Sequence, residues 1–485
     1  MKKDSLGRHP ARRGLHIVFG GVLGAAWFVS PGSVFIILLV AAVSALLYRR
    51  VSPEDRRFVI ILFLLGFLLR ALLSVGLDVG SRLVTGQWPG KHAAPSGWDL
   101  GIRDQTREYV KMGDSDYLSQ RGYAAAQFAR GSQAPVVLYR LQQGYAQNGY
   151  TYVVGAFYYL FGFSPVAIKL VNCLIGALLG PALFALAKAC FNAPIARWSS
   201  AVVTFFPSLL FWSASNLKDP AIHLLTFLLC WVFVQISRAR TVWTRIGYGL
   251  LSIAMLWAHT TLRSAAYSLL LPASFLGAAG LLWAARRPWR LAAIGVLLAG
   301  ALWTHPQPVQ SAFLRAFSMH AGHVNTAGLS YRYLPDAYYA SGYFKTVQDP
   351  GRVVTPRMLS RAVPAAVFHY LLEPLPRTTD NVLLWCALLQ MMLWYLIVGL
   401  AAVGVWWSLR WNSRRGLFPV TALAAWLMVG ALTNGNIGTV IRMRDMITPF
   451  VVLFAGAGGW ALAGGWRIAD GRALQDVRPG AALAS

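Results

Sequence analysis

The chain has 485 residues, of which 56% are hydrophobic and 13% charged, and its mean hydropathy is +0.51. Lys and Arg number 44 against 17 Asp and Glu, so the formal net charge is +27. Such a charge can indicate nucleic-acid binding, but the basic residues form short clusters at the ends of apolar runs, as anchoring to lipid headgroups requires. The composition therefore favours membrane lipids as partners and argues against nucleic acid.

Apolar runs of roughly 17 to 25 residues recur along the chain, and helices of that length cross a hydrocarbon core of roughly 30 Å. The sequence thus predicts an all-α polytopic membrane protein with about twelve transmembrane helices. The predicted spans cover residues 15–30, 33–48, 58–77, 165–189, 197–215, 220–237, 244–260, 264–285, 290–304, 381–408, 416–434 and 444–465.

The basic clusters set the expected orientation, because cytoplasmic loops of membrane proteins carry an excess of Lys and Arg. Placing the basic N-terminus in the cytoplasm leaves two long segments outside, and segments of this length usually carry function, so we expect them to contain short helices. The predicted divisions are a cytoplasmic N-terminus (1–14), N-terminal helices (15–77), a first external loop (78–164), central helices (165–304), a second external loop (305–380), C-terminal helices (381–465) and a cytoplasmic tail (466–485).

Two of the scarce acidic residues, Asp114 and Asp116, stand almost side by side in the first external loop. A carboxylate there can take a proton from an incoming hydroxyl or hold a divalent cation near a phosphate. The alternative is helix capping, with Asp114 or Ser115 as the N-cap of a helix that begins near Tyr117. The two interpretations are compatible, and the loop placement favours a functional role.

Lys218 and Asp219 stand where one predicted span ends and the next begins, with Pro220 suited to the first turn of the new helix. At the bilayer surface they can position a lipid-linked phosphate, or they can simply be a snorkelling lysine and a helix cap. Arg263 follows the same logic at the end of another span, and His259 near it is more often a satisfied interfacial histidine than a base.

Arg442 and Arg444 fall on the expected external side, where the positive-inside bias does not require them. Two arginines one residue apart, preceded by a Gly-rich turn that contains Asn436, suit bidentate binding of phosphate or pyrophosphate. The alternative is a salt bridge to Asp445 or to loop carboxylates. Candidates of a second rank are Glu373, Arg377, the tyrosines of the second loop (Tyr331, Tyr333, Tyr338, Tyr339 and Tyr343) and the aromatic run from Tyr150 to Phe163, which suit either an interfacial belt or sugar stacking.

The sequence contains no Gly-x-x-x-x-Gly-Lys-Ser/Thr, no His-Glu-x-x-His and no Gly-x-Ser-x-Gly motif. These absences argue against nucleotide hydrolysis, zinc proteolysis and serine esterase chemistry. The four cysteines lie in or beside apolar segments without C-x-x-C spacing, which is typical of small buried hydrophobic side chains.

From about residue 60 to 465 the chain resembles bacterial integral membrane glycosyltransferases of the GT-C class, with the closest likeness to the protein O-mannosyltransferase-like group of polysaccharide and envelope assembly. The resemblance is carried by the Asp-bearing first loop, Tyr152 to Phe163 with the following Lys169-Leu170-Val171-Asn172, Phe206 to Asp219, and Gly435 to Thr439 with Arg442 and Arg444.

The resemblance implies a polyprenyl-phosphate-linked sugar donor, a glycan, lipid or protein acceptor outside a bacterial cytoplasmic membrane, and a catalytic aspartate at Asp114 or Asp116. Arg442, Arg444, Lys218 and Arg263 would then bind the donor phosphate, supported by Asp219, Tyr117 and Asn436. Use of a divalent cation such as Mg²⁺ or Mn²⁺ varies within the class and stays open.

Two alternatives remain. An O-antigen polymerase or ligase would transfer a pyrophosphate-linked oligosaccharide, and such chemistry relies more on Arg and His than on an acidic pair. A transporter or flippase for a lipid-linked anion would carry internal repeats, broken helices and charges at the bilayer midplane, whereas the charges singled out above stand at helix ends.

Overall fold

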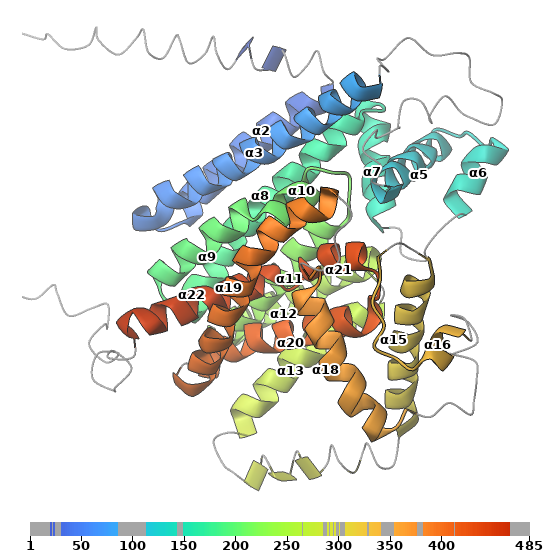
Figure 1. Ribbon diagram of the computed structural model, residues 1–485. Coiled ribbons are helices and arrows are strands. Elements are labelled where there is room, and N and C mark those ends of the chain that lie inside the picture. The colour runs from blue at the N-terminus through green and yellow to red at the C-terminus, as the bar shows by residue number, and fades with distance from the viewer. Residues whose placement is uncertain are drawn as a thin grey trace, which may run out of the picture. The chain divides into compact units, whose positions relative to one another are not determined.

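The computed structural model describes residues 31–85, 113–142, 149–263, 265–284, 306–326, 329–340, 354–375, 382–411 and 413–465, together with a few residues within 20–24 and 289–300. Within these ranges the chain is helical apart from short connections, and it forms no strand, since its one β contact is an isolated bridge between Ser330 and Asn436 (Figure 1). The expected all-α class of membrane protein is therefore confirmed.

Six helical stretches in the described residues are long and apolar enough to cross a membrane. A bent pair, α21 (Ile437–Arg444) and α22 (Thr448–Trp460), meets the same test when its two parts are taken together, with a bend of 58°. The six are α2 (Pro31–Arg50), Pro53–Gly80 of α3 (Pro53–Thr85), α8 (Pro165–Cys190), α11 (Asp219–Arg238), Leu388–Arg410 of α19 (Val382–Trp411) and Gly416–Thr433 of α20 (Ser413–Thr433).

The described residues thus support six or seven spans, and the expected twelve are not reached. Residues 197–215 are divided between α9 (Ala193–Phe205) and α10 (Pro207–Ser213), because Pro207 begins a new helix. Helix α12 (Val242–Leu262) forms where a span is expected but does not reach the required hydropathy. Helix α13 (Ala265–Ala284) also forms where a span is expected, and the part of it whose side chains are described is the apolar stretch Leu270–Leu281. The spans expected at 15–30 and 290–304 lie mostly outside the described residues.

The chain divides into two compact units. The first unit comprises Met1–Pro181, Leu209–Leu225 and Trp257–Ser264, and the second comprises Ala182–Ser208, Thr226–Leu256 and Ala265–Ser485. Each unit therefore mixes segments that the linear divisions of the sequence keep apart. In the first unit the residues of the expected first external loop join short pieces of α10, α11 and α12.

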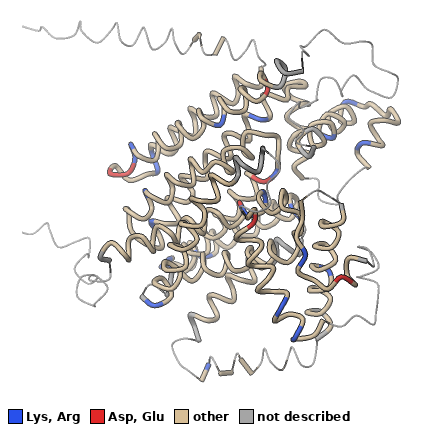
Figure 2. The backbone as a smooth tube through the Cα atoms, viewed as in Figure 1, with Lys and Arg blue, Asp and Glu red and all other residues tan. Residues whose placement is uncertain are grey.

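In the first unit, α2 and α3 pack against each other, and many of their charged residues gather at the turn that joins them (Figure 2). Residues 113–161 form α5 (Gly113–Ala129), α6 (Pro135–Gln142) and α7 (Gly149–Phe161) (Figure 1). Helices α5 and α7 approach closely, since a Cβ on Gly122 would overlap Val154 and one on Gly155 would lie 2.8 Å from the Ala125 Cβ. Small residues therefore fix α5 on α7.

In the second unit, α19 and α22 make the most extensive helix contact, and α22 also packs on α9. Backbones touch where Gly404 of α19 faces α22, because a Cβ there would overlap the Phe454 carbonyl. Residues 306–372 contribute α15 (Pro306–Thr326), α16 (Asp336–Ala340) and α18 (Pro356–Leu372), with α15 and α18 both contacting α20. Lipid tails are as apolar as the side chains of a helix, so helices in a membrane gain little hydrophobic free energy by associating. They associate instead through close packing, which small residues allow.

We predict that Gly404→Ala lowers the melting midpoint of the purified protein in detergent by many degrees or prevents folding, because the added methyl group collides with backbone that cannot move aside. Gly399→Ala on the same helix is the matched control, since a Cβ at Gly399 meets nothing within 4 Å. Tryptophan fluorescence against temperature measures both variants. Equal melting midpoints would contradict the close packing of α19 on α22.

Candidate functional site

The acidic pair lies on a helix, and the helix begins earlier than the sequence suggests. Asp114 and Asp116 fall in the first turn of α5, which starts at Gly113 instead of near Tyr117; their side chains lie outside the described part of the chain. We call residues 113–117 the acidic turn. Because each helical residue advances about 100°, positions 114 and 116 stand about 200° apart around the axis. The pair therefore does not share one face of α5.

Ser115, which stands between the two aspartates, ties the acidic turn to the loop before α11. Its hydroxyl oxygen accepts a hydrogen bond from the Asn216 backbone N–H at 3.0 Å, and the Asn216 side-chain Nδ2 donates to Ser119 Oγ at 2.7 Å. Ser115 and Asn216 are fully buried. The acidic turn is thus fixed beside the Ser215 to Asp219 motif, one of the other candidate motifs of the sequence.

Two further polar side chains complete this buried Asn216 network, which we define as Ser115, Ser119, Tyr150, Asn172 and Asn216. The Tyr150 hydroxyl lies 2.7 Å from Asn216 Oδ1 and 2.9 Å from Asn172 Oδ1. Asn172 Nδ2 donates to the carbonyls of Ser215 and Leu217, each at 2.7 Å. The network therefore satisfies the backbone of an irregular loop that no helix could satisfy.

Lys218 and Asp219 follow directly from this loop. The Lys218 carbonyl accepts the first helical hydrogen bond of α11 from Ile222 N at 3.2 Å, and Asp219 is the acidic residue of the first turn, with 1% of its surface exposed. This start of α11 matches the helix-cap interpretation of the motif. Lys218 is half-buried at the same end of the helix.

Arg263 belongs to the first unit as well. It closes α12, where its backbone N–H donates to the His259 carbonyl at 2.9 Å. The end of α12 touches the start of α7, because a Cβ on Gly149 would overlap the Thr261 side chain. Gly149 directly precedes Tyr150 of the Asn216 network. The first unit therefore brings together the acidic turn and the motifs at 215–219 and 259–263.

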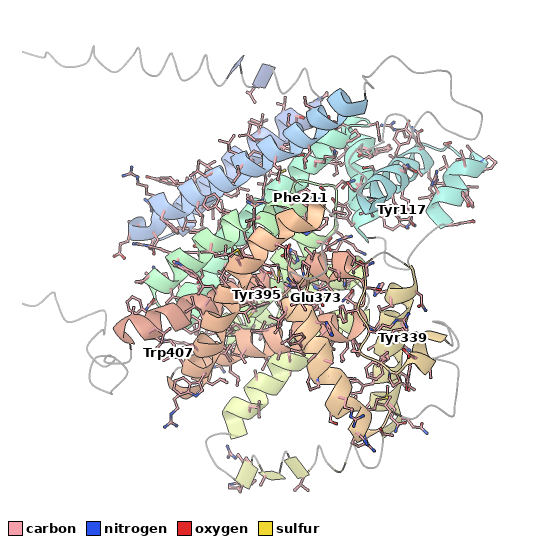
Figure 3. The ribbon with its side chains drawn as sticks, in the orientation of Figure 1. Tyr117, Phe211, Tyr339, Glu373, Tyr395 and Trp407 are labelled. Carbon is pink, nitrogen blue, oxygen red and sulfur yellow. The ribbon has the colours of Figure 1, made fainter. Side chains whose placement is uncertain are left out.

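Tyr117 has a local structural partner (Figure 3). Its hydroxyl accepts a hydrogen bond from Arg121 Nη1 at 3.2 Å, and the guanidinium lies 5.4 Å from the centre of the tyrosine ring. Arg121 also donates to the carbonyls of Arg140 at 3.1 Å and Leu141 at 2.9 Å. The Tyr117 and Arg121 pair thus anchors the end of α6 against α5.

Arg444 does not occupy the position of a phosphate ligand. It is 3% exposed, its Nε donates to the Tyr370 carbonyl at 3.0 Å, and its Nη2 donates to the Glu373 carbonyl. Its Nη1 lies 2.8 Å from the sulfur of Met391. All three nitrogens are thus used inside the second unit, so we assign Arg444 to structure and withdraw it from the expected phosphate ligands.

The other late candidates also lie in the second unit. Asn436 is the N-cap of α21, where its side chain accepts from Thr439 N at 3.1 Å. Arg442 is half-buried on α21, and Asp445, the alternative partner named for the arginines, accepts a hydrogen bond from Ser208 at 2.7 Å. The Asn436 contact supplies a helix cap.

Histidines and tyrosines from α15, α18 and residues 329–339 form a second polar cluster, which surrounds the residues before α21. The rings of Tyr331 and His369 stack at 4.5 Å, and those of His320 and Tyr333 lie 3.9 Å apart. The Tyr331 hydroxyl donates to the Asn434 carbonyl at 2.5 Å. The expected sugar-stacking or interfacial tyrosines of this segment therefore pack mainly against one another and against backbone.

Glu373 ends α18 within this cluster (Figure 3). One of its oxygens lies 3.1 Å from His369 Nδ1, and the other accepts the Leu375 N–H at 2.9 Å. Burial raises the pKa of the Glu373 carboxyl, but the hydrogen bonds from His369 and Leu375 outweigh burial, so its pKa lies below the ordinary 4.5. Arg377, its companion in the sequence, lies outside the described residues.

The low pKa of His320 predicts that the stability of the folded protein depends on pH. Burial lowers its pKa from 6.5 to about 3, the nearby Asn434 carbonyl offsets part of that shift, and His323 and His369 add to it. Below pH 6.5 the unfolded chain binds a proton that the folded chain accepts only near pH 3, so stability falls as pH drops through this window, by up to about 1.4 kcal/mol per pH unit. Melting midpoints between pH 7 and pH 4 should fall less steeply in His320→Gln than in the unchanged protein, and parallel curves would refute the assignment.

Sequence reasoning missed the role of Asn172 and Asn216 as the centre of a network, and it missed Arg70. Asn172 lies about two turns into the apolar helix α8, and Arg70 stands among apolar residues well inside the stretch Pro53–Gly80. A polar or charged residue inside a span is costly and is by default a candidate for function. That signal was present in the sequence for both Asn172 and Arg70.

Among the residues described, no group of three or more His, Cys, Asp or Glu side chains is arranged to hold a metal ion. The helices and their apolar surfaces define the class: a multi-pass membrane protein built from α-helices. No family model matches the chain, and no curated protein is significantly similar to it.

Proposed function

We propose that this protein is a glycosyltransferase of the cytoplasmic membrane that moves a sugar from a polyprenyl-phosphate-linked donor to an acceptor on the external face. Asp114 or Asp116 is the general base, and Lys218 and Arg263, which belong to the same unit as the acidic turn, are the cations proposed for the donor phosphate. The resemblance to GT-C enzymes supplies the donor class. The proposal keeps the termini in the cytoplasm and the acidic turn outside.

The observation that carries the proposal is the pair of hydrogen bonds from Asn216 to Ser115 and Ser119. They hold an acidic helix start against the loop that leads into Lys218 and Asp219, and the first unit also contains Arg263. A carboxylate and cations held by a rigid, buried framework are what a transfer reaction at a membrane surface requires. Fixed geometry matters because positioning contributes much of the rate in such reactions.

The proposed reaction is a single displacement. The aspartate takes the proton from an acceptor hydroxyl, the hydroxyl oxygen forms a bond to the anomeric carbon, and the bond from that carbon to the phosphate oxygen breaks. Polyprenyl phosphate leaves with the electron pair, and positive side chains stabilise its growing charge. The anomeric centre is inverted, so the configuration of the product reports on the mechanism.

The direct test supplies purified protein in liposomes with isoprenoid phosphosugars of several sugar types and follows glycosylated product by mass spectrometry. Product formation from a monophosphate donor supports the proposal. Transfer from pyrophosphate-linked oligosaccharides alone would favour the polymerase or ligase alternative. Absence of transfer from every donor, together with movement of the intact lipid between leaflets, would favour a transporter instead.

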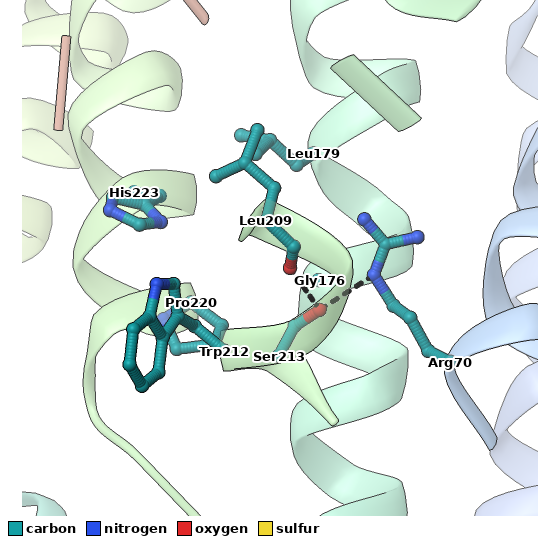
Figure 4. A pocket seen from close by; sticks show the side chains of 8 residues that line it. All are labelled: Arg70, Gly176, Leu179, Leu209, Trp212, Ser213, Pro220 and His223. Atoms are coloured by element: carbon teal, nitrogen blue, oxygen red, sulfur yellow. Dashed lines mark hydrogen bonds between the residues drawn. The ribbon is translucent and has the colours of Figure 1, made fainter. Parts of the chain in front are cut away.

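The transporter alternative gains support from one observation. Arg70 is fully buried in the apolar stretch Pro53–Gly80, and charges inside spans are typical of transport proteins. The cavity beside Arg70 (Figure 4) measures about 10 Å³, which is the space of about one water molecule and far below that of a lipid headgroup. The glycosyltransferase therefore remains the preferred function.

A further inference from the structure

Helix α7 has one packed face and one exposed face, although none of its 13 residues is charged. The packed face lies on α5, where Val154 approaches Gly122 and Gly155 approaches Ala125 (Figure 1). The exposed face, which we call the bare face of α7, is formed by Tyr152, Val153, Ala156, Tyr159 and Leu160. Because each helical residue advances about 100°, these positions fall within an arc of about 120° that points away from α5.

The bare face is unusual for a surface in contact with water. Tyr152 is 65% exposed and Leu160 is 71% exposed, and α7 is too short to cross a membrane. A contiguous exposed apolar surface marks a site of contact with lipid or with another protein. Tyrosine is typical of the boundary between membrane and water, because its ring is apolar and its hydroxyl is hydrated. The composition of the bare face therefore favours lipid at that boundary.

The chain holds α7 close to the end of a membrane-spanning helix. Helix α7 ends at Phe161, and α8, which is long and apolar enough to cross a membrane, begins at Pro165. Gly162 turns the chain between them with a φ of 78°, which favours glycine. A connection of this length separates the two helix ends by at most about 14 Å. The end of α7 therefore lies near the membrane surface at which α8 begins.

The same end of α7 packs on the first turns of α2, another helix able to cross a membrane. A Cβ on Gly32 would lie 2.8 Å from the Phe157 ring, and the rings of Phe35 and Phe161 stack with their centres 5.0 Å apart. Phe35 belongs to the exposed apolar surface of α2. Because Leu160 directly precedes Phe161, the bare face adjoins a surface of α2 that is suited to lipid.

A positive charge stands beside the bare face. Arg130 is exposed, and its Nη2 donates to the Tyr159 carbonyl at 2.9 Å and to the Tyr158 carbonyl at 3.3 Å. The guanidinium carbon lies 5.5 Å from the centre of the Tyr159 ring. Among the described residues Arg130 forms no ion pair, and phosphates of lipid headgroups carry the complementary charge at this level of a membrane.

We propose that the bare face of α7 lies in the membrane surface at which α8 begins, with Tyr152, Tyr159 and Leu160 among the headgroups and upper acyl chains and Arg130 at the lipid phosphates. Helix α5 then lies on the side of α7 that faces water, about 8–10 Å from the α7 axis. This lipid contact does not depend on the proposed transfer reaction. Where that reaction takes place, the contact keeps the acidic turn near a phosphate that is attached to a lipid.

The test places a nitroxide label on the full-length protein in liposomes through Tyr152→Cys or Leu160→Cys. Gln133→Cys, at an exposed polar position between α5 and α6, is the control. The three described cysteines are buried, and the unchanged protein measures the background label. The ratio of collisions with oxygen to collisions with a water-soluble nickel chelate should be several times higher at positions 152 and 160 than at 133, at a depth of about 5–10 Å. Ratios equal to the control would overturn the proposal and favour the sugar-stacking role of these tyrosines.

A second measurement uses the unchanged protein, so it decides the question if a cysteine variant does not fold. The protein is reconstituted with phospholipids that carry a photoreactive diazirine in the upper part of an acyl chain, and labelled peptides are identified by mass spectrometry. Adducts are expected on residues 152–160 as well as on the exposed residues of α2. Adducts on α2 without any on residues 152–160 would refute the lipid contact of α7.

Discussion

One of the two substitutions Asp114→Asn and Asp116→Asn is expected to lower the rate of sugar transfer by about a hundredfold or more, and the other to leave most of it. General-base catalysis contributes about this factor. Because positions 114 and 116 stand about 200° apart on α5, a single acceptor hydroxyl meets only one of them. Initial rates with saturating donor and acceptor measure the effect.

Both variants should keep the melting midpoint of the unchanged protein, since Ser115 and Ser119 hold the acidic turn through their hydrogen bonds with Asn216. The control for position is Ser115→Ala, which removes the hydrogen bond to the Asn216 backbone without touching either carboxylate. It should lower the rate moderately and leave the pH dependence of transfer unchanged. Full activity in both aspartate variants would remove the general base from the proposal.

Arg444→Met should destabilise the protein by about 2–5 kcal/mol. The substitution keeps apolar volume but leaves the carbonyls of Tyr370 and Glu373 without their buried donor, and each such loss costs about 1–3 kcal/mol. Backbone carbonyls cannot be replaced by apolar groups, so the loss is not compensated. Melting midpoints in detergent measure it.

Arg442→Met is the matched control, because Arg442 is half-buried on the same helix and its loss should cost much less. Equal melting losses at both positions would contradict the structural role given to Arg444.

Sequence patterns predicted the long helices well, and the described residues support six or seven of the twelve expected spans. The expected runs 165–189 and 220–237 match α8 and α11 within a residue, because apolar length and a starting proline or aspartate mark such helices clearly. Hydropathy did not show that Phe206 ends one helix and Pro207 starts another. In α12 the mean hydropathy is too low for a span because the helix contains Arg245, Trp257 and His259 among its apolar residues.

For the candidate site, the sequence identified motifs but not their partners. The acidic turn lies beside Asn216 because of hydrogen bonds between residues about a hundred positions apart. A single sequence does not show such contacts. The sequence also did not show the partners of Arg444. Its charge on the expected external side looked unexplained, but its guanidinium donates hydrogen bonds to the carbonyls of Tyr370 and Glu373. The pattern of side chains in a sequence does not show which backbone carbonyls will accept hydrogen bonds.

The Asn216 network has a consequence for biosynthesis. Its earlier members, at positions 115, 119, 150 and 172, leave the ribosome before position 216, which supplies both the amide and the side chain that join them. During translation the segment with the two aspartates is therefore made before Asn216, and it lacks the hydrogen bonds that hold it until α10 and the loop before α11 have been synthesised. A nascent chain arrested before Asn216 should leave that segment open to proteases, and one arrested well after it should not.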